Sequence, residues 1–140
     1  MRPLAAIESA LDDFAASPDA PDAAERLLAL AEEVLENWVA ARGGTPTDGT
    51  SEGFRLLALH RQGARGVPSF NACRETCREI VYHHNLLRAE PGHELLGPQC
   101  ERMMVMLVKH LALFVSGKLQ VEGLGEFCCA SRPLREESTL

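Results

Sequence analysis

The stretch that decides the fold is residues 69–88, SFNACRETCREIVYHHNLLR. A period near 3.6 residues with one apolar face is typical of an amphipathic helix packed on a core. We therefore predict a long helix over 69–89, which ends before Pro91 and Gly92. Glu75 and Glu79 lie opposite the apolar sector. The sector itself contains Phe70, Cys73, Cys77, Ile80, Val81, His84 and Leu87.

The chain on either side of this stretch also shows helical periodicity. Residues 4–14 have 3-4-3 apolar spacing, and a broader apolar face follows Asp22, which we expect to cap a second helix. Gly43 and Gly44 are expected to end that helix. A short helix is predicted at 54–62, and a last major helix at 98–116 with Pro98 in its first turn.

These segments predict an all-α fold: a single-domain helical bundle of four to five helices within residues 1–130. We expect the two longest C-terminal helices to form an antiparallel hairpin. A chain of 140 residues is long enough for one core. Residues from Lys118 onward show no clear period and are expected to form a looped or strand-like cap. Residues 131–140 are predicted to be a disordered tail.

The chain is expected to be cytoplasmic, without a membrane span. Its longest apolar run, 103–108, is followed by Lys109 and His110 and is far shorter than the ~20 residues that a span needs. The start, MRPLAAIESALDDF, reaches acidic residues before a signal peptide could develop. The five cysteines should then be reduced, and an odd number disfavours a closed disulfide framework.

Cys73 and Cys77 suggest a metal site whose third ligand lies on the last helix. Residues four apart are one turn away, ~6 Å, so both thiolates can reach one ion. His84 is excluded because it lies seven residues, ~10 Å, beyond Cys77. In an antiparallel hairpin His110 lies opposite Cys77, and His60 or a water completes a tetrahedron. Such ligands favour zinc or copper(I).

Packing explains the same residues without any cofactor, and this is the interpretation that we favour. Free cysteine behaves as a small buried hydrophobe. The Cys-x3-Cys spacing lacks the paired Cys-x2-Cys pattern of structural zinc sites. A thiol redox switch is a further interpretation, although helical geometry strains a Cys73–Cys77 disulfide. Cys128 and Cys129 leave the same choice open between metal binding, oxidation and burial.

The last helix is apolar on almost every side, which is typical of a central helix or of an oligomer interface. We place His110 and the main apolar stripe, Met103, Met106, Leu107, Leu113 and Phe114, toward the core. The remaining apolar residues are then left to face a second copy of the chain in a homodimer. This predicted interface consists of Met104, Val105, Val108, Ala112 and Val115.

The net charge of -6 argues against a nucleic-acid binder, although residues 55–88 are locally basic. That stretch contains six arginines and only two acidic residues, Glu75 and Glu79. In a helix-turn-helix interpretation, Asn71, Arg74 and Arg78 would contact the DNA groove. The six-residue link before Ser69 is longer than the usual turn. Solvated helix faces also explain the charges, and this is the interpretation that we favour.

No nucleophile motif, phosphate loop or zinc-protease helix is present in the sequence, so we do not predict an enzyme. The favoured function is that of a small cytoplasmic accessory or regulatory protein that acts through protein–protein association. The alternatives are a metal- or redox-responsive module built on the Cys/His cluster, and a helix-turn-helix DNA-binding protein.

Overall fold

The computed structural model describes residues 1–16, 22–89 and 96–124, and these form the predicted all-α bundle. Within these residues there is no strand, only an isolated bridge between Ser51 and Phe54. The expected tail at 131–140, Cys128 and Cys129 lie outside the described residues. The elements are α1 (Leu4–Ala16), α2 (Ala23–Ala41), α3 (Arg55–Ala64), a 3-10 helix η1 (Pro68–Cys73), α4 (Arg74–Ala89) and α5 (Leu96–Val121).

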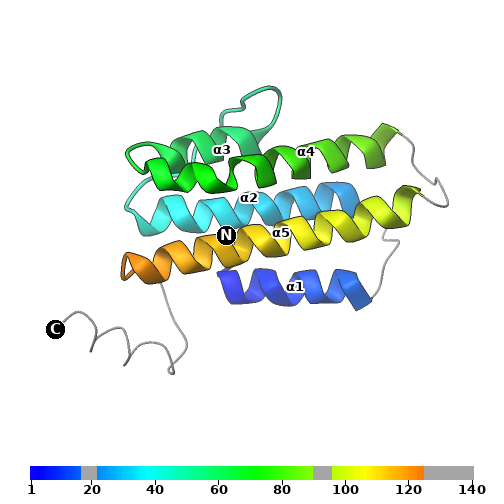
Figure 1. The fold of residues 1–140 in the computed structure, drawn as a ribbon, viewed down its shortest axis with the longest axis horizontal. Helices are drawn as coiled ribbons and strands as arrows, with labels where there is room; N and C mark the ends of the chain where they lie inside the picture. The colour runs from blue at the N-terminus through cyan, green and yellow to red at the C-terminus, as the bar shows by residue number, and fades with distance from the viewer. Residues whose placement is uncertain (17–21, 90–95, 125–140) are drawn as a thin grey trace.

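Helices α2 and α5 form the centre of the bundle. Each packs against α1 and α4, they pack against each other, and α2 also packs against α3. Helices α4 and α5 lie side by side and run in opposite directions, so the antiparallel hairpin is confirmed (Figure 1). Helix α1 lies along the other side of α5 (Figure 1). This arrangement leaves one face of α5 between α1 and α4.

The predicted continuous helix from Ser69 is divided into two parts. Residues Pro68–Cys73 form the 3-10 helix, and the α-helix starts only at Arg74. Val67, rather than Ser69, occupies the N-cap position. A 3-10 helix has three residues per turn, so Phe70 and Cys73 point to the same side, and both are buried. The tighter first turn thus brings both side chains into the core.

Two glycines end the central helices in the same way. Gly43 has φ 84°, and its N–H and that of Gly44 bond to the carbonyls of Ala40 and Val39. Gly123 has φ 69° and, with the next residue, makes the equivalent pair of bonds at the end of α5. This is the Schellman motif, which favours glycine at the left-handed position.

The first of these stops was predicted, whereas the second was placed too early. Helix α5 continues through Gly117 to Val121 instead of ending at Ser116, because the first left-handed residue after the start of α5 is Gly123. At the other end of α2, the predicted N-cap Asp22 makes no side-chain capping bond. Its carboxylate instead lies 3.8 Å from Arg26, one turn into the helix.

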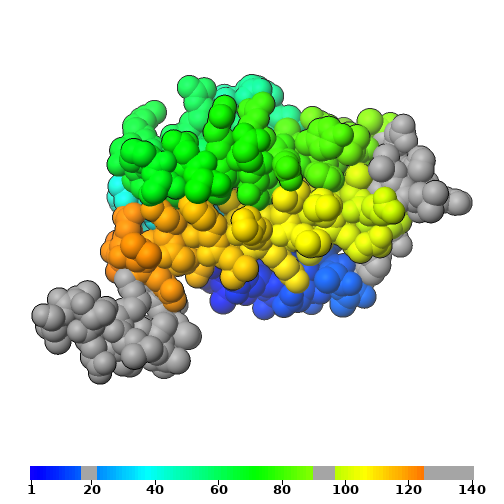
Figure 2. Space-filling model, viewed as in Figure 1, coloured from blue at the N-terminus to red at the C-terminus, as the bar shows by residue number. Residues whose placement is uncertain are grey.

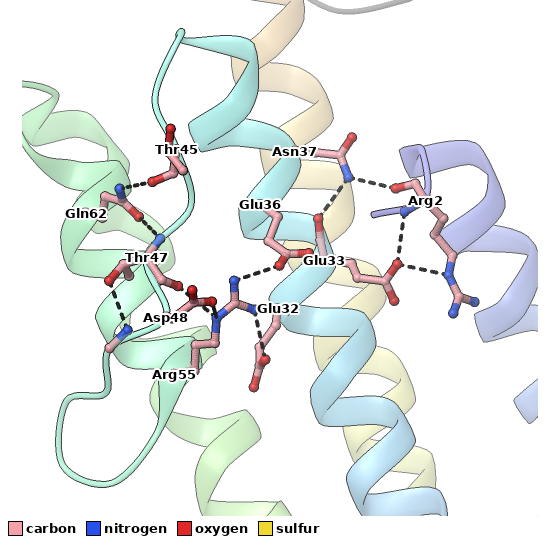
Figure 3. Close-up of polar contacts among 11 residues, drawn as sticks. Arg2, Glu32, Glu33, Glu36, Asn37, Thr45, Thr47, Asp48, Arg55 and Gln62 are labelled. Carbon is pink, nitrogen blue, oxygen red and sulfur yellow. Dashed lines mark hydrogen bonds and ion pairs between the residues drawn. The ribbon is translucent and has the colours of Figure 1, made fainter.

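The loop between α2 and α3 is fixed by two polar side chains of α3 (Figure 3). The guanidinium of Arg55 lies 3.3 Å from Glu32 and 2.8 Å from Glu36 of α2, and its Nε donates to the carbonyl of Thr47 at 2.8 Å. The amide of Gln62 accepts from the N–H of Thr47 and donates to the carbonyl of residue 45. The loop is therefore held against two helices before it reaches Ser51.

Helix α5 is also long and apolar enough, by length and composition alone, to cross a membrane. Its Gly97–Val121 window has a mean hydropathy of 1.4, a longer apolar segment than the run at 103–108 suggested. The core helix of a bundle passes the same test, so this is weak evidence for a span. In the bundle α5 packs against three helices, and Glu101 on it is buried. The absence of a membrane span stays a prediction.

Candidate functional site

The residues predicted to form a dimer interface are buried in the chain's own core. They lie on the face of α5 that packs against the other helices, so the assignment of the two faces was wrong. Both faces of α5 are apolar, and the sequence pattern does not say which one the bundle covers. The buried residues in question are Met104, Val105, Val108, Ala112 and Val115.

The opposite face of α5 carries an exposed apolar stripe. Met103, Met106 and Leu113 are 41%, 64% and 66% exposed, and His110 between them is exposed as well. We call these four residues the outer stripe. Their spacing is 3-4-3, the heptad pattern of a helix that pairs with another helix. Figure 2 shows α5 at the surface as a band between α4 and α1.

The predicted four-ligand metal centre does not assemble. Cys73, Cys77 and His60 are buried, whereas His110 lies on the outer stripe and is exposed. His110 was predicted to face Cys77, but it lies on the exposed side of α5. Within the residues that the structure describes, no group of three or more His, Cys, Asp or Glu side chains could hold a metal ion.

The other three residues form a buried cluster beneath η1. The thiol of Cys73 donates to the carbonyl oxygen of Phe70 at 3.2 Å, and Nε2 of His60 lies 3.3 Å from the same oxygen. The ring of His60 also stacks on the ring of Phe70. Cys77 is one turn further along α4 and is fully buried. We call His60, Cys73 and Cys77 the thiol cluster.

Interactions inside the thiol cluster shift the pKa values of its two thiols in opposite directions. A hydrogen bond from Cys77 and a weaker one from His60 lower the pKa of Cys73 to about 6, against the opposing effect of burial. The same bond to Cys73, together with burial, raises the pKa of Cys77 well above its usual value. Cys73 is thus the thiol that ionises first, and Cys77 is its hydrogen-bond donor.

A pocket of about 290 Å³ opens between the loop at 51–54, α3 and α4. Arg61 of α3 and Arg74 and Arg78 of α4 line it, and the buried His60 also forms part of its wall. We call this cavity the arginine pocket. Because His60 belongs to both, the pocket adjoins the thiol cluster.

Glu52 places one carboxylate in the arginine pocket. Its backbone has φ 53°, the left-handed region that non-glycine residues rarely adopt, and it precedes Gly53, which has φ 84°. The carboxylate lies 2.8 Å from the guanidinium of Arg78. A hydrogen bond from Arg78 and then the charges of Arg78, Arg74 and Arg61 lower the pKa of Glu52. Glu52 therefore lies in the combined field of three arginines.

His84 lies apart from the thiol cluster, as its spacing predicted. Its Nε2 lies 3.9 Å from Glu25 of α2, and its ring meets Phe54 edge-on. Its Nδ1 is buried and has no hydrogen-bond partner among the described residues. Glu25 also accepts a hydrogen bond from Arg88. These contacts connect the start of α2 with the end of α4.

The arginine pocket was not predicted from the sequence, because the arginines were interpreted as solvated helix faces or as a DNA-contacting face. The loop residues that complete the pocket, Ser51 and Glu52, lie between two predicted helices, in a segment to which no site residue was assigned. The available signal was a Glu-Gly pair in a turn that directly precedes a helix carrying Arg61. We compared the chain with protein-family models, with curated proteins and with solved structures, and it matches none of them.

Proposed function

We propose that this chain is a small accessory or regulatory protein that acts through protein–protein association, and that the outer stripe of α5 pairs with a second copy. The observation that supports this proposal is the exposure of Met106 and Leu113 on a helix whose other apolar face is already buried. Large apolar side chains exposed at heptad spacing are typical of a surface that binds another helix.

A second copy fits the outer stripe because the stripe is self-complementary. In an antiparallel pairing with its twofold axis near His110, Met103 of one copy lies level with Gly117 of the other. Gly117 has open space at its Cβ position and leaves room for a methionine side chain. Met106 then lies level with Leu113 or Phe114 of the partner. On each side of the axis, large apolar residues thus meet a glycine or apolar residues, and the two His110 residues lie level with each other at the axis.

The size of the stripe sets the expected affinity. From Met103 to Gly117 the helix rises about 21 Å, at 1.5 Å per residue. One pair of helices of that length buries less area than a standard interface of about 1,600 Å². We therefore expect a reversible dimer with a dissociation constant of about 1–100 μM rather than an obligate one.

Sedimentation equilibrium over a concentration series tests this proposal. Met106→Lys should raise the dissociation constant at least tenfold, because it places a charge at the centre of the stripe. Tyr82→Lys is the matched control: Tyr82 is also a large exposed side chain, but it lies on α4 and not on the outer stripe. A wild-type chain that stays monomeric at several hundred micromolar would refute the dimer.

The thiol cluster favours a second candidate function, a thiol module that responds to oxidants. Three observations support it: Cys73 shares the carbonyl of Phe70 with His60, Cys77 lies one turn away, and the arginine pocket reaches His60. A thiolate close to a histidine and to arginines is the usual setting of a reactive cysteine. Because Cys73 is only 2% exposed, an oxidant has to reach it through a local opening next to His60.

The chemistry proposed for Cys73 is oxidation by a hydroperoxide. The thiolate sulfur attacks one peroxide oxygen, the O–O bond breaks, and the departing hydroxide takes a proton to leave as water. The sulfur becomes a sulfenic acid, which an added thiol reduces through a mixed disulfide. Cys77 is poorly placed to close a disulfide because helical geometry strains that bond.

Mass spectrometry after treatment with hydrogen peroxide tests this second candidate. One oxygen atom should be added at Cys73 and removed by a thiol reductant, and His60→Phe should slow the reaction. Cys100 is the control because it is buried and its pKa is raised by burial. Equal oxidation of Cys73 and Cys100 would show that the cluster confers no special reactivity.

A further inference from the structure

Neither association nor thiol chemistry accounts for the three arginines that line the arginine pocket. It combines a concave shape, a volume of about 290 Å³ and three guanidinium groups from two helices. Arg61 and Arg74 are exposed, so both can rearrange around a ligand. Leu57 adds an apolar wall. Concave sites with a few converging polar groups are the usual form of small-molecule sites.

The charges of the pocket do not balance. Three arginines face one carboxylate, that of Glu52, which Arg78 holds at 2.8 Å. Arg61 donates instead to the hydroxyl of Ser51 at 3.3 Å. Among the residues that line the pocket, the charge left after the pair of Glu52 and Arg78 is that of two guanidinium groups, and Glu75, outside the lining, also acts on Arg78. This excess fits an anion that carries close to two charges, which a phosphate monoester does at neutral pH.

Glu52 shows where such an anion would bind. The bonds between the backbone groups of Ser51 and Phe54, both 3.0 Å, close the turn that holds Glu52 in its left-handed conformation. A non-glycine residue in that region is strained and persists only because its surroundings hold it. Its carboxylate therefore acts as a tethered internal anion at the entrance of the arginine cluster, and a bound anion would compete with it.

The geometry points to a binding site for a small phosphomonoester in the arginine pocket, with Arg61, Arg74 and Arg78 as the phosphate ligands and Leu57 against the body of the molecule. Guanidinium groups bind phosphate through paired N–H donors, which makes arginine the preferred residue for this role. The volume is sufficient for a phosphate and a body of a few atoms, not for a large cofactor. This site is independent of the proposed dimer, because its residues lie on α3, α4 and the loop rather than on α5.

The probe that tests the site is phenyl phosphate, measured by isothermal titration calorimetry at low ionic strength. Comparison with inorganic phosphate measures how much the phenyl group contributes to affinity, and comparison with phenol measures how much the phosphate group contributes. We expect phenyl phosphate to bind at least threefold tighter than inorganic phosphate, and phenol not to bind. Affinity should fall as salt is added, because the contacts are between charges.

Three variants define which residues bind the probe. Arg74→Gln and Arg78→Gln should each weaken binding of phenyl phosphate about tenfold, whereas Glu52→Gln should strengthen it several-fold because the tethered carboxylate no longer competes. Arg102→Gln is the matched control: Arg102 is an exposed arginine on α5 that is not part of the pocket, and its loss should change nothing.

Two outcomes would overturn the inference. If phenyl phosphate does not bind, or binds equally well to Arg74→Gln and Arg102→Gln, the pocket is not a phosphate site. If a single-stranded oligonucleotide binds much more tightly and with a steep salt dependence, the arginines belong to a nucleic-acid surface instead. Circular dichroism of each variant confirms that it is folded, so loss of binding is not mistaken for unfolding.

Discussion

The indole N–H of Trp38 donates to the carbonyl oxygen of Gly63 at 2.9 Å, and a Cβ placed on Gly63 would lie 2.8 Å from the same indole ring. Helices α2 and α3 can therefore approach this closely only if residue 63 is glycine. The ring of Trp38 also stacks on the ring of Phe70, with ring centroids 4.7 Å apart and an angle of 11° between the ring planes. Through Phe70, the glycine helps to set the position of the thiol cluster.

Gly63→Ala should destabilise the chain although alanine is the better helix former. The added methyl would press on Trp38 and Phe70, and overpacking of this kind costs about 1–3 kcal/mol. Gly117→Ala is the matched control: it lies inside α5, nothing is within 4 Å of its Cβ position, and it should stabilise by about 0.5–1 kcal/mol. Urea unfolding in dilute protein measures both. A Gly63→Ala chain that is as stable as the wild type, or more stable, would contradict the close contact.

Arg55→Gln should destabilise the bundle most at neutral pH. Burial raises the pKa of Glu32, an effect that Arg55 opposes. Without the guanidinium, Glu32 and Glu36 remain as neighbouring half-buried carboxylates, and we expect a loss of about 1–3 kcal/mol. A carboxyl with a raised folded pKa takes up a proton on folding, so the unfolding free energy of the variant should recover as the pH falls through the raised pKa of Glu32.

The control for Arg55→Gln is a variant that removes the two carboxylates as well. Arg55→Gln combined with Glu32→Gln and Glu36→Gln should recover much of the lost stability at neutral pH, because no unpaired charge remains. Chemical denaturation of the wild type, Arg55→Gln and the triple variant at neutral and acidic pH gives the six unfolding free energies to compare. If the loss is the same at both pH values, the destabilisation comes from the lost bond to the Thr47 carbonyl and not from the carboxylates.

Cys73 should ionise at an unusually low pH. Hydrogen bonds from Cys77 and then from His60 lower its pKa to about 6. The difference in ultraviolet thiolate absorbance between wild type and Cys73→Ala should therefore have its midpoint near that pH. Cys77→Ala should raise the midpoint most and His60→Phe less, following the order of the two donors. A midpoint above pH 8 in the wild type would contradict the role of the cluster.

The same shift predicts how stability depends on pH. Cys73 releases its proton on folding wherever the pH lies between its folded pKa and the unfolded value of about 8.5. Its contribution is therefore complete above the unfolded pKa and is lost as the pH falls through about 6. Unfolding of Cys73→Ala should lack this rise with pH, whereas Cys100→Ala should retain it.

The sequence predicted the helices well because their signals are local. The 3.6-residue period over 74–89 and Gly43 at the end of α2 depend only on residues close in the chain. The 3-10 turn at Pro68–Cys73 was missed because a helical wheel assumes one constant period. The late end of α5 was missed because Gly117 is tolerated inside a helix that is held by packing on three sides.

The candidate sites were harder to predict because they depend on which side of each helix the bundle covers. Helix α5 has two apolar faces, and the sequence pattern did not show which one is buried. Leu113 and His110 were therefore predicted to face the core and Val108 to be exposed, whereas Val108 is buried and Leu113 is exposed. The pairing of Cys73 with His60 follows from the η1 turn, which brings both to the Phe70 carbonyl. The arginine pocket depends on the left-handed Glu52, a conformation that its residue type disfavours.

Lysine substitutions on the two faces of α5 should behave in opposite ways. Val108→Lys places an unpaired charge at a fully buried position and should unfold the chain or lower its stability by several kcal/mol. Leu113→Lys lies on the outer stripe, so stability should change by about 0.5 kcal/mol or less while the dimer dissociates. Thermal unfolding and sedimentation equilibrium, measured on both variants, separate folding from association. A Leu113→Lys chain that unfolds, or a Val108→Lys chain that stays folded and monomeric, would mean that the two faces of α5 have been assigned the wrong way round.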